Sequence, residues 1–255
     1  MNVMENQSAE KRFKSFSKYA SLIVMALGVL ALVGWIFDIQ AFKSVLPGLA
    51  TLKANTALAF LLAGIALWVA SQENVKPLAL RLAQICRIIV FLIGLLTLGE
   101  YQFERNIGID QLIFTDLQTP QAAFPGRMAF ATALCFALIG AASISSHAGT
   151  GKVLDAGQYL AVVAVLISFL ALVGYIYDVQ ALHQLGPYSS MALHTAAGLA
   201  LLALGTLSLQ ADRGWVRIIS TETAGGVVLR RLLPRIGHTT YGGLADRFRR
   251  SGWSI

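Results

Sequence analysis

One carboxylate stands at the end of a long apolar stretch of this sequence and is the first candidate for chemistry. Glu100 follows the apolar run Ile88–Gly99, and the next two arginines along the chain are Arg105 and Arg127. If the run crosses a membrane, an ionisable group in it is costly unless it has a partner or faces a water-filled cavity. Glu100 is therefore interpreted either as a ligand contact or protonation switch, or as an interfacial carboxylate paired with one of these arginines.

Three threonines recur at the start of three apolar runs. The strings that contain them are Asn55-Thr56-Ala57-Leu58, Ala131-Thr132-Ala133-Leu134 and His194-Thr195-Ala196-Ala197. A threonine at the start of a helix can cap that helix or hydrogen-bond to a neighbouring helix. If the three runs surround one axis, the threonines would form a small polar pocket together with Asn55 and His194, although Ala131 brings no polar group.

The spacing of histidine and cysteine favours structural roles over metal binding. His183 and His194 are the histidines expected on the same side as Glu100, but eleven residues that include a loop separate them. A hydrogen-bonded or pH-responsive histidine is therefore favoured over a haem or metal ligand. Cys86 and Cys135 lack the spacing of a zinc site or a disulfide framework. No cofactor or metal is expected, and the sequence contains no hydrolase, metalloprotease or nucleotide-binding motif that would predict an enzyme.

The elements that must position these side chains are six long apolar windows. The chain has 255 residues, of which 56% are hydrophobic and 13% are charged, about half the charged share of an average protein. The windows are Tyr19–Phe37, Ala54–Ser71, Ile88–Gly99, Met128–Ser146, Gly157–Tyr177 and Met191–Leu209. About 20 apolar residues cross a hydrocarbon core, so the sequence predicts an all-α integral membrane protein with six transmembrane helices. The third window is short, and Arg87 before it is expected to reach toward the lipid headgroups.

Repetition predicts that the six helices form three repeated helix pairs. Each first helix ends in a similar string: Gly34-Trp35-Ile36-Phe37-Asp38, Gly99-Glu100-Tyr101-Gln102-Phe103 and Gly174-Tyr175-Ile176-Tyr177-Asp178. Self-similar units of this size are expected to pack around a common axis. Asp38 and Asp178 are expected in interfacial water. An aromatic belt at the membrane surface is expected from Trp35, Tyr101, Tyr175, Tyr177 and Tyr188.

The distribution of lysine and arginine predicts the orientation in the membrane. Sixteen of these 20 residues fall in the two tails and in the second and fourth connections, and four fall on the other side: Lys43, Lys53, Arg105 and Arg127. The positive-inside rule then places both termini in the cytoplasm, and the expected location is the inner membrane of a bacterium. The net charge of +7 is interpreted as a topology signal and not as a nucleic-acid-binding surface.

Three regions are predicted along the chain. They are a cytoplasmic arm at 1–18, a six-helix membrane domain at 19–210 and a cytoplasmic tail at 211–255. The tail is expected to carry an interfacial amphipathic helix at 222–234, whose arginines would lie near anionic lipid.

The connection between the third and fourth helices differs from the others because it is long and apolar. It runs from Glu104 to Arg127 and is expected to fold over the outer end of the bundle as a short interfacial helix or lid. Asp110 and Arg127 are its candidate closing charges. The predicted ligand-binding site beneath it consists of Glu100, Asn55, Thr56, Thr132, His194, Thr195, Asp110 and Arg127. A small polar or weakly cationic molecule would suit this set.

Several strings of the sequence are similar, in order, to a known membrane module. The strings are Asn55–Leu62, Leu98–Tyr101, Gly108–Phe114, Pro125–Met128, Thr132–Leu134 and Gly225–Pro234. Over about residues 25–234 the chain resembles the N-terminal multi-helix membrane sensor module of bacterial PAS-containing sensor histidine kinases and diguanylate cyclases. The resemblance implies a sensory input role, with a cytoplasmic output domain after the membrane module.

The expected function is therefore a membrane-embedded signal-input module, but here the chain reaches Ile255 without room for a kinase, cyclase or PAS domain. It would be either a stand-alone sensor or a truncated one. Its expected partners are the lipid bilayer, a separate histidine kinase or diguanylate cyclase, and a second copy of the chain as a further candidate; no nucleic-acid partner is expected. The alternatives are a small-solute transporter and a structural membrane subunit.

Overall fold

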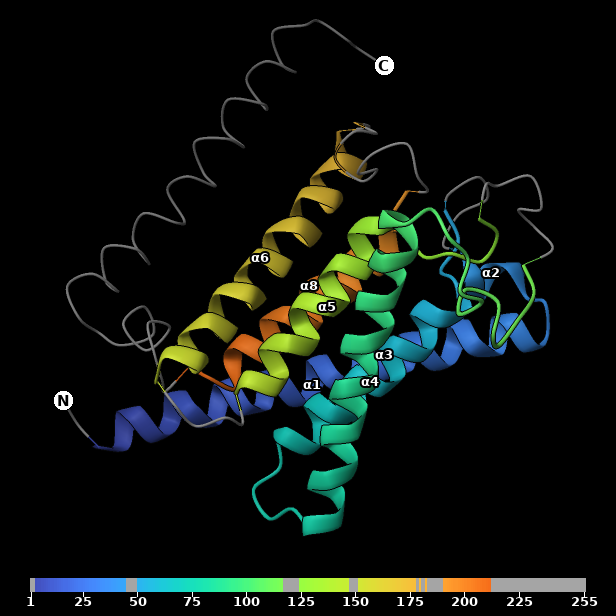
Figure 1. Cartoon of the computed structure of the whole chain (residues 1–255). Coiled ribbons are helices and arrows are strands. Elements are labelled where there is room, and N and C mark those ends of the chain that lie inside the picture. The colour runs from blue at the N-terminus through green and yellow to red at the C-terminus, as the bar shows by residue number, and fades with distance from the viewer. Residues whose placement is uncertain are drawn as a thin grey trace, which may run out of the picture. The chain divides into compact units, whose positions relative to one another are not determined.

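The computed structural model describes residues 3–44, 50–116, 124–146, 151–177, 179, 182 and 190–211. Regular secondary structure within these ranges is helical throughout. The helices are α1 (Val3–Ile36), α2 (Gln40–Lys43), α3 (Ala54–Ala70), α4 (Pro77–Gln102), α5 (Phe130–Ser145), α6 (Gly151–Ile176) and α8 (Leu193–Ser208) (Figure 1). The predicted all-α class is therefore confirmed for the described part of the chain.

The chain divides into two compact units, Met1–Gln210 and Ala211–Ile255. All of the helices named above belong to the first unit. The second unit lies outside the described residues beyond its first position, and with it the predicted amphipathic helix at 222–234. Asp178, His183 and Tyr188 also lie outside the described residues.

Three helices are long and apolar enough to cross a membrane. They are Glu10–Ile36 within α1, Pro77–Gln102 in α4 and Lys152–Ile176 within α6. The apolar helices α3, α5 and α8 are shorter, with 17, 16 and 16 residues. At 1.5 Å per residue they reach about 24–26 Å, which is less than the roughly 30 Å of a hydrocarbon core. The described residues thus contain three candidate spans, and the number six stays a prediction.

The short third window of the sequence belongs to a long helix. α4 has 26 residues and begins with Pro77 in its first turn, where the missing backbone N–H of proline costs nothing. Arg87 lies inside the bundle with 3% of its surface exposed, and its Nη1 donates to Gln84 Oε1 at 3.0 Å. The expectation that Arg87 reaches out to the headgroups is therefore wrong.

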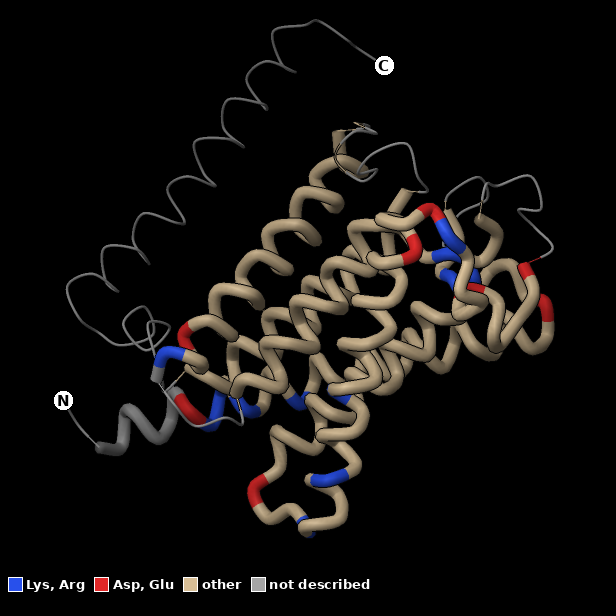
Figure 2. Tube along the Cα trace, viewed as in Figure 1, with Lys and Arg blue, Asp and Glu red and all other residues tan. Residues whose placement is uncertain are grey.

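The helices pack as three pairs whose second members meet in the middle. α1 packs on α3, α4 on α5 and α6 on α8, and α1 also packs on α8 (Figure 1). α3, α5 and α8 contact one another. Most charged residues gather in the loops and near helix ends, and the long stretches between them are uncharged (Figure 2). Three inner helices are therefore surrounded by three outer helices with an apolar interior.

Large apolar side chains fill the middle of the three inner helices. Phe60, Phe136 and Leu199 stand at equivalent positions, five residues after the first residue of each threonine string, and none of them is exposed. The rings of Phe60 and Phe136 meet edge to face with their centroids 5.1 Å apart. Phe60, Phe136 and Leu199 thus form a closely packed layer that is a main part of the core.

Glycine allows the first two pairs to pack closely. A Cβ on Gly28 would lie 2.7 Å from the Ala57 oxygen, and a Cβ on Gly94 would lie 2.6 Å from the Ala133 oxygen. These distances are too short for any side chain, so the two glycines let the backbones of each pair touch. The contacts are equivalent in the two pairs.

Hydrogen bonds fix the register of the repeat. Trp35 Nε1 donates to Leu52 O at 2.9 Å, Tyr101 Oη to Met128 O at 2.7 Å and Tyr175 Oη to Met191 O at 2.6 Å. Each bond joins the end of an outer helix to the residue three before Asn55, Ala131 or His194. These aromatic side chains thus hold each pair together, and the predicted surface belt is wrong for Trp35 and Tyr101, which are 8% and 6% exposed.

The same bonds correct the alignment of the repeated strings by one residue. The carbonyl oxygens of Gly34, Glu100 and Gly174 each accept the N–H of the fifth residue that follows, at 2.9, 3.2 and 2.8 Å. Glu100 is therefore equivalent to the two glycines, and Tyr101 is equivalent to Trp35 and Tyr175. The alignment that matched Gly99 with Gly34 is wrong.

Candidate functional site

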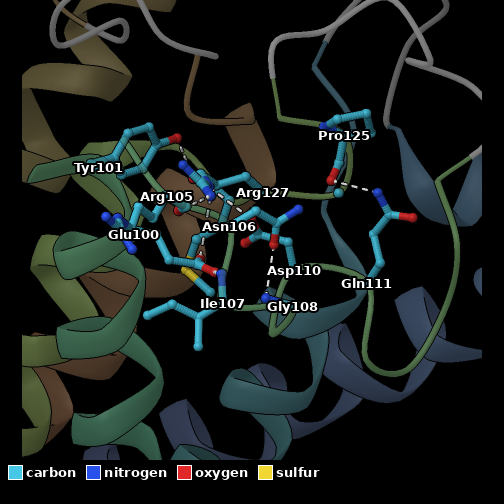
Figure 3. Close-up of polar contacts among 12 residues, drawn as sticks. Glu100, Tyr101, Arg105, Asn106, Ile107, Gly108, Asp110, Gln111, Pro125 and Arg127 are labelled. Carbon is cyan, nitrogen blue, oxygen red and sulfur yellow. Dashed lines mark hydrogen bonds and ion pairs between the residues drawn. The ribbon is translucent and has the colours of Figure 1, made fainter. Parts of the chain in front are cut away.

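The lid is residues 104–127, of which 104–116 and 124–127 are described, and its charges meet the end of α4. Arg127 Nε donates to Asp110 Oδ2 at 2.7 Å, and Arg127 Nη2 lies 3.6 Å from Glu100 Oε2. Their exposed fractions are 2% for Arg127, 3% for Asp110 and 0% for Glu100. We call these three residues the charge cluster (Figure 3). The structure thus brings together three of the eight predicted site residues.

Aromatic rings and a carbonyl surround the guanidinium. Arg127 Cζ lies 3.8 Å from the centroid of the Phe124 ring and 5.1 Å from that of Tyr101. Its Nη2 also donates to the Arg105 carbonyl at 3.0 Å. Cation–π contacts of this kind contribute about 0.5–2 kcal/mol, more when water is excluded. Arg127 is therefore firmly held, and Arg105 contributes its backbone and not its side chain.

Glu100 fixes the first turn of the lid. Its Oε1 accepts the backbone N–H of Ile107 at 2.7 Å (Figure 3). The chain reverses here through Glu104, whose φ is 49°, and through Gly108, which follows Ile107 directly and has a φ of 92°. Asn106 Oδ1 accepts the Gly108 N–H at 2.8 Å and closes this turn. The Glu100 carboxylate thus accepts a backbone N–H that would have a carbonyl partner if the helix continued.

Gly126 brings the two ends of the lid together. Its φ is 78°, and a Cβ there would lie 2.8 Å from the Asp110 oxygen. Gln111 Nε2 donates to the Pro125 carbonyl at 3.2 Å across the same approach (Figure 3). Only glycine combines this φ with so close a contact, so Asp110 and Arg127 are adjacent because of Gly126.

A second buried ion pair ties the lid to the first helix pair. Lys53 Nζ lies 2.6 Å from Asp116 Oδ2, and only 12% and 1% of these side chains are exposed. Gly126 N–H donates to the same carboxylate at 3.3 Å. The ring of Phe114 stacks on Trp35 with centroids 6.2 Å apart. The lid is therefore attached both to α4 and to the segment that leads into α3.

A third ion pair, between Lys43 and Asp38, lies at the end of α1. Lys43 is 2% exposed, pairs with the exposed carboxylate of Asp38 and lies 4.6 Å from the centroid of the Trp35 ring. Asp38 has a φ of 54° at the turn between α1 and α2. The sequence placed Asp38 in interfacial water and indicated no partner for Lys43 or Lys53. For Asp38 and Lys43, the neighbouring aromatic residues Phe37 and Phe42 were the available signal, and Lys53 had none.

The threonines lie where they were expected along the chain, but they do not cap their helices. The N-cap residues of α3, α5 and α8 are Lys53, Ala129 and Ala192, and none makes a side-chain capping bond. The three threonines stand in the first turn and are each 2% exposed: Thr56, Thr132 and Thr195. The capping interpretation is therefore wrong, and no described contact joins the threonines to the charge cluster.

Two further predicted residues have buried polar atoms that need partners. Asn55 Oδ1 accepts the Thr56 N–H at 2.8 Å, but within the described residues Asn55 Nδ2 and His194 Nε2 have no hydrogen-bond partner. Asn55 and His194 are at equivalent positions of different inner helices. No hydrogen bond or ion pair of the described residues joins either of them to the charge cluster.

Arg87 faces a small cavity that sequence reasoning missed. The cavity measures about 10 Å³, which is about the room that one water needs. Equivalent residues of the inner helices line it, among them Leu67, Ser143 and Thr206. These residues stand near the helix C-termini, where a cation interacts favourably with the helix dipoles. Arg87 therefore places a positive charge at the end of the bundle that lies opposite the charge cluster.

The chemistry of the charge cluster is set by burial and by an excess of acid. Burial raises the pKa of the Asp110 carboxyl, and its hydrogen bond to Arg127 acts in the opposite direction. Among the described residues, no group of three His, Cys, Asp or Glu side chains could hold a metal ion. The cluster can hold charge, exchange a proton or bind a small polar group.

Comparison of the chain with protein-family models, with curated proteins and with solved structures gives no match.

Proposed function

We propose that the chain is a membrane-embedded signal-input module, which senses a stimulus at the lid and relays it along the bundle. In this proposal the six apolar helices cross the inner membrane of a bacterium as three pairs, with both termini in the cytoplasm. No catalytic step is assigned to the chain. A separate histidine kinase or diguanylate cyclase, as in a two-component system, would receive the signal, and a second copy of the chain is a further candidate partner.

The observation that supports this role is the attachment of one lid to two consecutive helices. Asp116 pairs with Lys53, directly before α3, and Arg127 pairs with Glu100, near the end of α4. α3 and α4 are joined at their other ends by residues 71–76. A change in the lid that shifts one attachment relative to the other would therefore displace this distant loop. A relay requires an element with two arrangements, and the proposal assigns that role to the lid.

The arrangement of the helices supports six spans. The shorter helices α3, α5 and α8 contact one another, and each packs on a longer helix, α1, α4 or α6. A short span surrounded by longer ones can be accommodated by local thinning of the bilayer, at fractions of a kcal/mol per Å. The length of the inner helices is therefore compatible with crossing.

Release of the lid in the full chain, reconstituted in lipid nanodiscs, tests the signalling role. Asp116→Asn removes one attachment and should increase hydrogen exchange in the lid. A relay predicts that exchange also changes in residues 71–76 at the other end. The matched control is Glu104→Gln, because Glu104 is exposed on the same lid and makes no described ion pair. A change confined to the lid would contradict the proposal and favour a structural subunit.

A small-solute carrier is the second candidate, and the cavity at Arg87 is the observation in its favour. A carrier needs a polar path, and this cavity holds a buried cation together with Ser143 and Thr206. Against it, Phe60 and Phe136 fill the interior between the cavity and the lid end. Uptake of labelled solutes by proteoliposomes, increased by Asp116→Asn, would favour the carrier over the sensor.

A further inference from the structure

The charge cluster contains one acid more than it contains cations. Glu100 and Asp110 share a single guanidinium, that of Arg127, and all three side chains are at least 97% buried. Arginine remains charged in proteins, so full ionisation would leave one net negative charge inside the site. A buried charge without a partner is strongly destabilising. The closed lid therefore requires something that neutralises this charge.

The carboxylate oxygens of the charge cluster that have no hydrogen-bond partner indicate which kind of group would neutralise it. In the described structure, Glu100 Oε2 and Asp110 Oδ1 accept no hydrogen bond, whereas Glu100 Oε1 and Asp110 Oδ2 are occupied by Ile107 and Arg127. Both carboxyl groups lie beside the same guanidinium, with Arg127 Nε 2.7 Å from Asp110 Oδ2 and Arg127 Nη2 3.6 Å from Glu100 Oε2. Ionised carboxylates only accept hydrogen bonds, so neither acid can donate to a free oxygen of the other unless one of them carries a proton.

We propose that the charge cluster is a proton-binding site, in which Glu100 and Asp110 together hold one proton while the lid is closed and release it when the lid opens. A proton neutralises the excess charge and supplies the missing donor. It also needs no volume among side chains that are already packed, unlike an ammonium group or a metal ion beside Arg127. This inference rests on the proposed function, since it names the proton as the stimulus at the lid.

The surrounding titratable groups already have partners. On α4, the hydroxyl of Tyr101 donates to Met128 O. Before α3, Lys53 pairs with Asp116 of the lid. Arg105 offers its carbonyl to Arg127 and exposes its side chain. The pair of carboxyl groups is therefore the part of this site that is left to change its charge.

Linkage gives the sign of the pH dependence. Burial raises the pKa of Asp110 above that of a solvated carboxyl. A group with a raised pKa in the closed state stabilises that state fully below its open-state pKa, about 4, and this stabilisation is lost as pH rises. Between the open-state and closed-state pKa values, the opening equilibrium increases about tenfold per pH unit, because each opening releases one proton. Low pH closes the lid, and high pH opens it.

The reporter for this equilibrium is the backbone N–H of Ile107, which donates to Glu100 Oε1. Hydrogen exchange of the full chain in nanodiscs is measured from about pH 5 to about pH 8 and corrected for the intrinsic exchange rate. The wild type should lose protection at Ile107, by up to about tenfold per pH unit. Glu100→Gln should stay protected at all pH values, because its amide oxygen still accepts from Ile107 and its NH₂ replaces the proton toward Asp110.

Glu104→Gln is the matched control and should keep the wild-type pH profile. Equal pH dependence in the wild type and in Glu100→Gln, or none in the wild type, would overturn the proposal. Infrared spectroscopy is the second measurement: the carbonyl stretch of a protonated carboxyl should be present in the wild type at about pH 5 and absent in Glu100→Gln. A cluster ionised at both acids and bridged by water lacks that band and also overturns it. Neither measurement involves residues 71–76, so failure here leaves the relay itself testable.

Discussion

Glu100 occupies in α4 the position that Gly34 occupies in α1. The carbonyl oxygen of each accepts the N–H of the fifth residue that follows, Arg105 and Ile39. At Gly34, a Cβ would lie 2.7 Å from the Cβ of Phe42, so α2 fills the space beside the helix. In the second pair the lid takes the place of α2, and the side chain of Glu100 occupies the space that Phe42 of α2 fills beside Gly34. The charge cluster is thus the point at which one repeat departs from the other two.

Removal of the only cation from the charge cluster should be costly. Arg127→Met leaves two buried carboxyl groups without a partner and should lower the free energy of unfolding by about 3–5 kcal/mol. Denaturant titration of the purified protein in micelles measures this change. Arg105→Gln is the control and should cost less than about 0.5 kcal/mol, since the Arg105 side chain is exposed. Adding Glu100→Gln to Arg127→Met should restore part of the loss.

The glycine contact between α4 and α5 should tolerate no side chain. In Gly94→Ala the new Cβ would lie 2.5 Å from Ala137 N and 2.6 Å from Ala133 O, which are backbone atoms. The substitution should lower stability by about 1–3 kcal/mol. Gly99→Ala on the same helix meets no atom within 4 Å and should be neutral or stabilise by up to about 1 kcal/mol. Equal stability of the two variants would show that the pair does not pack as described.

The aromatic bonds to the loop carbonyls should contribute similarly in different pairs. Tyr101→Phe and Tyr175→Phe each keep the ring but leave the carbonyl of Met128 or Met191 without its donor. Each should cost about 1 kcal/mol in thermal or denaturant unfolding. Tyr177→Phe is the control, because Tyr177 is 59% exposed. If only one of the two substitutions lowers stability, the two hydrogen bonds do not contribute equally to their helix pairs.

Topology reporters distinguish six spans from three. If all six helices cross, the chain is cytoplasmic at residue 76 and outside at residue 115, so a phosphatase fused after 115 is active and one fused after 76 is not. If only α1, α4 and α6 cross, the two activities are exchanged. The same fusions made with a reporter that is active only in the cytoplasm should give the complementary pattern.

Much of the architecture could be predicted from the sequence because hydrophobic length and repetition are local signals. The apolar runs indicated the helices and their pairing, and the long apolar connection indicated a lid that carries Asp110 and Arg127. The charges of the lid could be anticipated because a buried carboxylate such as Glu100 needs a partner. Glu100 and Arg127 are separated by 27 positions of the chain, so the sequence made their contact plausible but did not determine it.

The register of the repeat and the burial of the other charges could not be predicted in the same way. Matching Gly99 to Gly34 aligned two similar strings, but Gly28 and Gly94 are equivalent only if Glu100 is matched to Gly34, and this depends on backbone contacts. Arg87 was assigned to the headgroups because it precedes the third apolar window, but α4 begins at Pro77, so Arg87 lies inside the helix and is buried. Lys53 and Asp116 are far apart in sequence, and only the folded lid brings them together.

The close glycine contacts imply that mechanical stiffness is distributed unevenly in the bundle. Gly28 and Gly94 hold α1 against α3 and α4 against α5, whereas the equivalent position of α6 is Ser168, whose hydroxyl donates to Ala164 O and lies 3.8 Å from Cys135 Sγ of α5. α6 therefore cannot lie as close to α8 through this position as its counterparts lie to their own partners. Under lateral tension or a change in bilayer thickness, we expect the first two pairs to move as rigid bodies and α6 to yield first.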